Sequence, residues 1–193
     1  MGSSMRRPPQ KFFRWIDESM TTVTISETDG AFLAQVREAM EFYFGADQRR
    51  IAHALKVTAH ARFLLGFIDA QPVLTLAACY LHDIGIPEAE RKYGCCAGKQ
   101  QEVEGPPVAR QILQRLGVDP ELIDAVCLLV SRHHTPAGVD SPEFRILWDA
   151  DALVNLTEVV SGKEQHRIEE ILSRSLVTEP GYRRACQLYL PTA

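Results

Sequence analysis

The sequence has no long apolar run and no excess of basic residues. Among its 193 residues, acidic side chains outnumber basic ones by 25 to 21, which gives a net charge of −4. Nucleic-acid polymers are bound through clustered positive charge, so we expect no such partner. No segment approaches the roughly 18–20 consecutive apolar residues that span a bilayer, so we expect no membrane association.

Cysteine is sparse and follows no pattern. The five cysteines are Cys79, Cys95, Cys96, Cys127 and Cys186. Cys79 and Cys127 lie in apolar stretches, where cysteine behaves as a small core residue. The adjacent pair Cys95-Cys96 lacks the usual spacing of a zinc or redox motif. An odd number of cysteines without a disulfide framework favours a reducing compartment, and we therefore expect a cytoplasmic location.

We interpret residues 1–28 as an N-terminal extension. Its first four residues, before Met5, are typical of a cloning remnant. The extension carries positive charge but has no apolar core of the kind that secretory signals contain. Apolar side chains near its middle are a weak indication of a homo-oligomer: Phe12, Phe13, Trp15 and Ile16.

Apolar residues recur at helical spacing through almost all of the remaining chain. The expected helices cover residues 31–44, 48–68, 73–84, 107–117, 120–134, 142–160, 163–175 and 181–189. Residues 87–105 are less regular and predict a loop or a broken helix. Strand-like alternation is confined to "TTVTIS" at 21–26. We therefore expect an all-α domain of six to eight helices.

Four places in this helical sequence carry residues that bind metals. They are His53 in "RIAHALKV", His82-Asp83 in "LHDIGI", His133-His134 in "SRHHTP" and Asp149/Asp151 in "LWDADALVN". A buried carboxylate is costly unless it is paired or bound to a cation. Metal sites in helical bundles are built from such inward-facing side chains on several helices. Imidazole and carboxylate ligands suit Mn²⁺, Fe²⁺, Co²⁺, Ni²⁺, Zn²⁺ or Mg²⁺.

The order His, His-Asp, Asp resembles the signature of the HD-domain superfamily. The matching pieces are His53, His82-Asp83 and "DADALVN", and "GPPVARQILQRLG" with "VSRHH" between them also looks like HD proteins. The resemblance implies one helical HD domain, which we expect to occupy residues 29–193 with its C-terminal helices. It also implies a divalent ion held by His53, His82, Asp83 and Asp151. The implied activity is the hydrolysis of a phosphomonoester or a phosphodiester. In many relatives the substrate is a nucleotide.

The hypothesis gives the candidate residues distinct roles. A metal-activated water attacks the phosphorus of a small phosphorylated substrate, and Asp83 both binds the ion and orients this water. His133 and His134 contact the phosphate or a second, weaker ion. Asp149 has the alternative role of orienting a histidine ligand. The candidate phosphate-binding residues are Arg132, Lys99, Arg91 and Lys56.

One position departs from the family pattern. Binuclear HD proteins usually have a histidine four residues before the glycine that is Gly105 here, and this chain has Gln101. Glutamine is a poor ligand for a second iron, so we expect one tightly bound ion and leave a second open. Two alternative functions follow from relatives and from the ligand set. They are a diiron oxygenase, which Gln101 argues against, and a non-catalytic regulator that binds a metal or a nucleotide.

Overall fold

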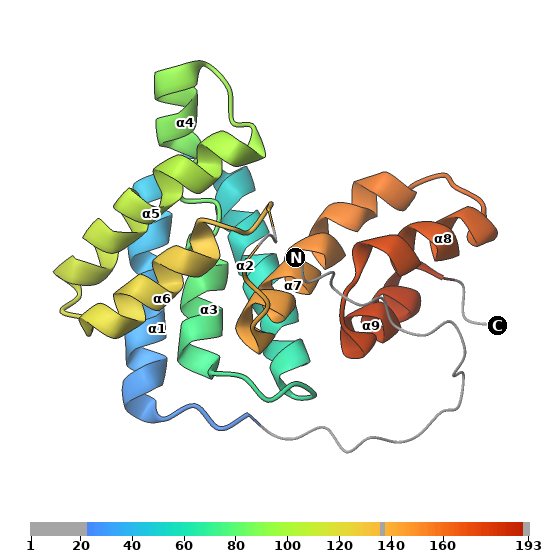
Figure 1. Cartoon of the computed structure of the whole chain (residues 1–193), viewed down its shortest axis with the longest axis horizontal. Coiled ribbons are helices and arrows are strands. Elements are labelled where there is room, and N and C mark those ends of the chain that lie inside the picture. Colours follow the sequence, from blue (N-terminus) through green and yellow to red (C-terminus); the bar gives the residue numbers. More distant parts are fainter. Residues whose placement is uncertain (1–22, 136–137, 191–193) are drawn as a thin grey trace.

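The computed structural model describes residues 23–135 and 138–190, and these residues form nine α-helices and no β-strand (Figure 1). The all-α prediction is confirmed. The helices are α1 (Glu27–Phe44), α2 (Gln48–Leu65), α3 (Pro72–Leu81), α4 (Ile86–Tyr93), α5 (Gly98–Arg115), α6 (Pro120–Val130), α7 (Pro142–Val160), α8 (Gln165–Ser175) and α9 (Glu179–Tyr189). Residues 23–26, the described part of the strand-like segment, form no regular structure.

The structure has more helices than the six to eight that the sequence predicts, and the difference lies in residues 87–105, where we expect a loop or a broken helix. This region contains the short helix α4 and the first turns of α5. Proline often starts a helix, which is why the sequence pattern placed a helix start at Pro107. The structure instead continues α5 through Pro106 and Pro107. Packing of α5 along α6 offsets the backbone hydrogen bonds that the two prolines cannot donate.

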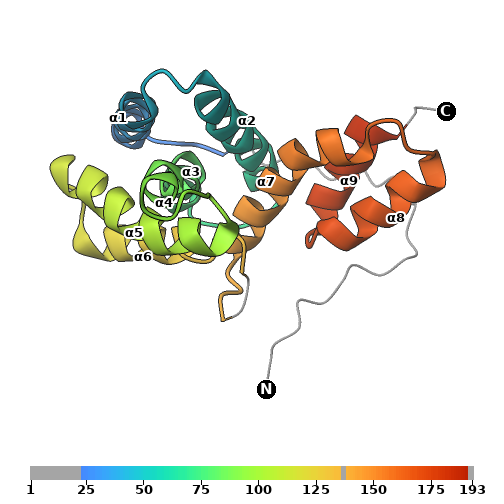
Figure 2. The same ribbon diagram turned by 90° about the horizontal axis from the view of Figure 1, so that it is seen from above.

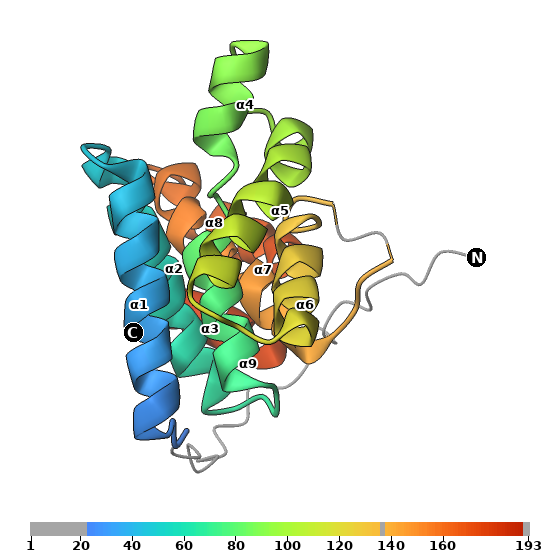
Figure 3. The ribbon, with the colours of Figure 1, turned by 90° about the vertical axis from the view of Figure 1, so that its left-hand side faces the viewer.

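Helix α3 is the centre of the fold. Every residue from Thr75 to Leu81 is buried, and α3 contacts α1, α2, α6 and α7 (Figures 1 and 3). A helix that is apolar on all sides can be stable only in the interior. The burial of α3 therefore carries the residues that follow it, His82 and Asp83, into the middle of the helical bundle.

Two helices lie outside this bundle. Helices α8 and α9 pack against α7, on the side of the molecule away from α5 and α6 (Figure 2). A third helix, α4, projects from the top of the molecule as drawn in Figures 1 and 3, above α5. Helix α7 therefore has one face on α2 and α3 and another on the two C-terminal helices.

In the part of the chain that the structure describes, no helix combines the length and the apolar character needed to cross a membrane. The apolar side chains at positions 12, 13, 15 and 16 lie outside the described residues. The N-terminal extension, the homo-oligomer and the cytoplasmic location therefore stay predictions.

Candidate metal centre

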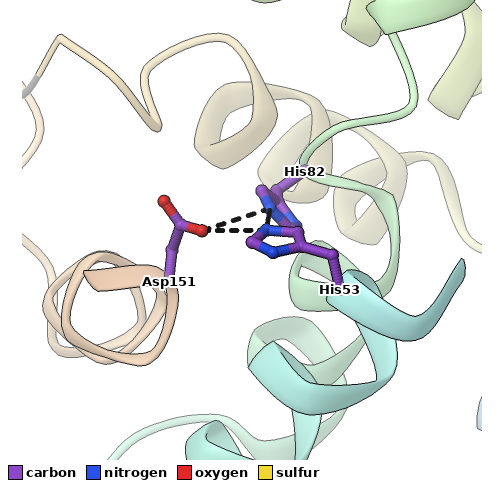
Figure 4. Close-up of side chains that lie close together, drawn as sticks. All are labelled: His53, His82 and Asp151. Atoms are coloured by element: carbon purple, nitrogen blue, oxygen red, sulfur yellow. Dashed lines mark hydrogen bonds and ion pairs between the residues drawn. The ribbon is translucent and has the colours of Figure 1, made fainter. Parts of the chain in front are cut away.

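Three ligand-type side chains from three different helices meet at one point (Figure 4). His53 lies on α2, His82 directly follows α3, and Asp151 lies on α7. The Nε2 atoms of His53 and His82 are 3.2 Å apart. The Oδ1 atom of Asp151 lies 3.0 Å from Nε2 of His53 and 3.7 Å from Nε2 of His82. Two imidazoles and a carboxylate thus direct their ligand atoms into one small space.

Asp83 connects this group to a second one. Its Oδ2 atom lies 3.5 Å from Nε2 of His53 and 3.4 Å from Nε2 of His82. Its other oxygen, Oδ1, lies 3.5 Å from Nε2 of His133. Asp83, His133 and His134 also bring one ligand atom each close together. Asp83 therefore stands between the two groups, with one carboxylate oxygen facing each.

The local backbone fixes which nitrogen each buried histidine presents. Nδ1 of His82 donates to the carbonyl oxygen of Cys79 at 2.8 Å, and Nδ1 of His133 donates to that of Val130 at 2.7 Å. Each accepting carbonyl lies in the last turn of a helix, where carbonyl groups lack an intrahelical partner. With Nδ1 occupied, Nε2 is the atom that points into the centre.

The charges of the centre stabilise one another. Burial lowers the pKa of His82, but the nearby carboxylates of Asp83 and Asp151 outweigh it and raise that pKa to about 9. Burial raises the pKa of Asp83, but His82 and His133 bring it well below its ordinary value. The pKa of Asp151 is also lowered, against the effect of burial, by its hydrogen bond with His53 and the charge of His82. Both carboxylates are therefore ionised at neutral pH.

A divalent ion fits these residues. Nε2 of His53, Nε2 of His82 and Oδ1 of Asp151 lie within 4.8 Å of one another, and Oδ2 of Asp83 lies 3.5 and 3.4 Å from the two nitrogens. Nε2 of His133, which is buried and has no hydrogen-bond partner among the described residues, is free for a further ligand such as a phosphate oxygen. The donors are imidazole nitrogens and carboxylate oxygens, a set that divalent transition metals and zinc accept. His53, His82, Asp83 and Asp151 would hold such an ion.

The His133-His134 turn is held in place by the first turns of α5. The carboxylate of Glu102 accepts hydrogen bonds from the backbone N–H of His134 at 3.0 Å and from the hydroxyl of Thr135 at 2.9 Å. Nε2 of His134 lies 3.2 Å from Oε1 of Gln101, whose amide nitrogen donates to a backbone carbonyl. Burial, followed by the charge of His133, lowers the pKa of His134. Gln101 thus contacts His134 directly, at the position where binuclear relatives have a histidine.

The glycine of "HDIG" has a steric role. A Cβ atom on Gly85 would lie 2.5 Å from the backbone oxygen of Gln101 and 2.5 Å from the backbone nitrogen of Gly105. A Cβ atom on Gly105 would lie 2.7 Å from a methyl group of Val130. The two glycines therefore allow three elements to approach one another closely: helix α5, helix α6 and the turn that follows α3. This close approach brings Asp83 to His133.

Asp149 does not contact any of the candidate ligands. Its carboxylate accepts hydrogen bonds from the backbone N–H groups of Val177 and Thr178, at 2.8 and 2.9 Å, and from the Thr178 hydroxyl at 2.5 Å. Gly181 allows this arrangement, because a Cβ atom there would overlap the carboxylate. The alternative role of Asp149, orienting a histidine ligand, is therefore wrong. It anchors the start of α9 on α7, since the two aspartates of "DAD" point to different sides of the helix.

Among the described residues, the predicted phosphate-binding side chains form no hydrogen bond or ion pair with the candidate ligands. Lys56, Arg91, Lys99 and Arg132 all have exposed side chains. Arg91 is paired with Glu88 at 2.7 Å. None of the four lines the pocket that opens beside Asp151. Their role in binding substrate stays a prediction.

Sequence reasoning missed two residues that support the centre. Glu102 gave no signal, because its contacts with the His133-His134 turn cross between helices far apart in the chain. Asn155 lies one helical turn after Asp151 in "DADALVN", and its amide donates to Oδ1 of Asp151 at 2.9 Å. This spacing on a predicted helix is the signal that could have identified Asn155.

Comparison with known proteins agrees with the geometry. No curated protein and no solved structure matches the chain. The family model of the HD domain matches residues 50–156, more than half of the chain. This segment contains His53, His82-Asp83, His133-His134 and Asp151. The chain therefore belongs to the HD domain family.

Proposed function

We propose that this protein is a metal-dependent phosphohydrolase that acts on a small organic phosphoester. The HD domain implies a superfamily of metal-dependent phosphohydrolases. The observation that supports the proposal most strongly is the convergence of His53, His82 and Asp151 from three helices, with Asp83 beside them. A divalent ion bound there lowers the pKa of a coordinated water and polarises a phosphoryl oxygen.

The side chains of the centre divide the remaining work. His53, His82 and Asp151 hold the ion, and Asp83 contributes Oδ2 to the same group. Oδ1 of Asp83 faces His133 and can accept a hydrogen bond from the attacking water, which orients that water toward phosphorus. His133 and His134 contact the phosphate oxygens or a second, weaker ion. Nothing in this arrangement requires a thiolate or an organic cofactor.

The test measures bound metal and phosphate release together. Protein purified without chelators is analysed for metal per chain, and phosphate release is screened with Mn²⁺, Fe²⁺, Co²⁺, Ni²⁺, Zn²⁺ and Mg²⁺. The unchanged chain should hold close to one divalent ion and release phosphate. The variant Asp83→Ala should lose the ion and at least a hundredfold in phosphate release. The matched control Asp140→Ala removes an exposed aspartate whose partner among the described residues is Arg145 at 2.6 Å, and it should change neither quantity.

Other outcomes would contradict the proposal. Phosphate release that persists in Asp83→Ala would exclude the proposed role of the centre. Close to two irons per chain together with oxygen consumption would favour an oxygenase, despite Gln101. Tight nucleotide binding without turnover under all six metals would favour a regulator.

A further inference from the structure

A pocket of about 420 Å³ opens beside the metal centre. His133, His134 and Asp151 line one end of it. Its volume is within the range of roughly 300–1,000 Å³ that is typical of small-molecule sites. A ligand with its phosphate at the centre could therefore extend away from the ion in this direction.

One wall of the pocket is an apolar strip on α7. Trp148, Ala152, Leu156 and Val159 all line the pocket, and their spacing of four, four and three residues places them on one helix face. From Asp151 to Val159 the helix rises by about 12 Å. The indole N–H of Trp148 donates to the backbone oxygen of Ser175 at 3.1 Å, which fixes the ring. The strip is longer than a phosphate group needs.

Helix α8 contributes a cation to the lining of the pocket. Arg174, near the end of α8, is the basic residue among those that line the pocket. Its side chain is 61 % exposed and pairs with Glu170, and Glu170 also pairs with Arg167. Exposed ion pairs of this kind contribute little free energy. Arg174 can therefore turn to an anionic ligand while Glu170 keeps Arg167 as its partner.

We propose that the substrate is a phosphoester with an aromatic or apolar organic group, which lies along the α7 strip while Arg174 binds the phosphate. This inference rests on the proposed function and adds the substrate's leaving group and the residues that select it. Guanidinium groups bind phosphate oxygens in pairs, which suits Arg174 better than a lysine. Trp148 lines the pocket, and an indole ring packs well against an aromatic group. Arg174 lies on α8, outside residues 50–156 that match the family model.

The first test compares a long and a short substrate. Val159 is 48 % exposed at the far end of the strip, and side chains on a helix lean toward its N-terminus. In Val159→Trp the indole should therefore cover the strip. We expect kcat/KM to fall at least tenfold for 4-nitrophenyl phosphate and less than twofold for methyl phosphate. The matched control Leu128→Trp, at a position 50 % exposed on α6, should change neither value.

The second test concerns Arg174. We expect Arg174→Ala to raise KM at least fivefold for both phosphoesters, with kcat changed less than twofold. The control is Arg167→Ala, because Arg167 is the other partner of Glu170 and does not line the pocket. This substitution should change neither KM nor kcat. Equal effects of the two substitutions would mean that the α8 ion pairs matter only for structure, and would overturn the role of Arg174.

A binding measurement separates this inference from the proposed function. The chain has two tryptophans, so in a Trp15→Phe background Trp148 is the fluorescent residue. The non-hydrolysable 4-nitrobenzylphosphonate should quench the fluorescence of Trp148 in the metal-loaded protein. The variant at position 159 is here Val159→Glu, because Val159→Trp would add a second fluorescent tryptophan. Arg174→Ala and Val159→Glu should each weaken this binding at least fivefold, and methylphosphonate should not quench.

The outcomes are distinguishable. If phosphate release depends on Asp83 but binding is the same in all variants, the pocket inference is wrong and the proposed function stands. If no phosphoester is hydrolysed, the proposed function fails. Quenching of Trp148 that depends on Arg174 and Val159 would still support the pocket as the binding site for the organic group, and its absence would overturn that assignment.

Discussion

The Oδ1 atom of Asp83 lies 3.5 Å from Nε2 of His133, an atom with no hydrogen-bond partner. The two residues are 50 positions apart and follow different helices. Their meeting joins the His53/His82/Asp151 group to the His133-His134 turn. It places an orienting carboxylate oxygen beside an imidazole nitrogen that has no hydrogen bond among the described residues, and we expect the reacting phosphate there.

His133 should therefore affect turnover more than the binding of the first ion. In His133→Ala we expect phosphate release to fall at least tenfold, because a contact to the phosphate is lost, while close to one ion per chain remains. Elemental analysis and a phosphate assay on the same preparation test this. His166→Ala, at an exposed position on α8, is the control. Loss of the ion in His133→Ala would instead make His133 a ligand of the first ion.

Binding of the ion should release a proton from His82. Its pKa of about 9 means that the imidazole is protonated at neutral pH in the metal-free chain. Since a metal needs the neutral imidazole, we expect the affinity for Mn²⁺ to rise by up to about tenfold per pH unit between pH 6 and 8. Titration calorimetry in two buffers of different ionisation enthalpy counts the released protons. The count should be near one at pH 7, and a count of zero would contradict the pKa.

The same pKa gives the metal-free chain an opposite dependence on pH. The folded-state pKa of His82 is raised above its ordinary value, so its contribution to the free energy of unfolding is present at low pH. That contribution is lost as the pH rises through about 9. Deprotonation of His82 should therefore lower the Tm of the metal-free protein between neutral pH and pH 9. The stabilisation by Mn²⁺ should grow over the lower part of this range.

Gly85 should not tolerate a side chain. In Gly85→Ala the new Cβ atom would press on the backbone of α5, and overpacking of this kind costs about 3 kcal/mol. For a chain of this size that corresponds to a fall in Tm of roughly 6–12 °C. Gly30, in α1, has no atom within 4 Å of such a Cβ, so Gly30→Ala should raise the free energy of unfolding by up to about 1 kcal/mol. Thermal unfolding of both variants is the measurement, and equal Tm values would exclude the close approach.

Asp149 should matter for stability and not for metal binding. In Asp149→Ala two backbone N–H groups and a hydroxyl at the start of α9 lose their acceptor. An unpaired buried donor costs about 1–3 kcal/mol; because these three are only partly buried, each should cost about 1 kcal/mol, and we expect a total loss of about 3 kcal/mol. Asp140→Ala, which breaks only an exposed ion pair, should cost less than about 1 kcal/mol. Denaturant unfolding measures the free energy of unfolding of both variants. A loss of bound metal in Asp149→Ala would instead mean that Asp149 contributes to the metal centre.

Much of the site could be predicted because its residue types are unusual in their local setting. His53, His82-Asp83 and Asp151 stand out as polar residues within apolar helical sequence, and their order resembles a known signature. Helical periodicity likewise predicted most helices, since it depends only on neighbours along the chain. The helix through Pro106 and Pro107 could not be predicted, because packing of α5 on α6 overrides the local preference of proline.

Residues that act across long distances in the chain carried no such signal. Glu102 and Arg174 look like ordinary charges on helix faces, and only the packing of α5 and α8 brings them to the His133-His134 turn and to the pocket. The choice between Asp149 and Asp151 is of the same kind. Both lie in "DAD", and the direction in which α7 faces its neighbours decides which one meets the histidines.

The amino-acid sequence by itself determined the helical class, the set of ligand-type residues and the family to which the chain belongs. These depend on residue identity, spacing and order, which are properties of the linear chain. The tertiary structure alone decided that Asp83 stands between two groups of ligands, that Asp149 anchors α9, and that an apolar strip and Arg174 line one pocket beside the centre. These depend on which helix faces meet, and that is set by packing of the whole core around α3.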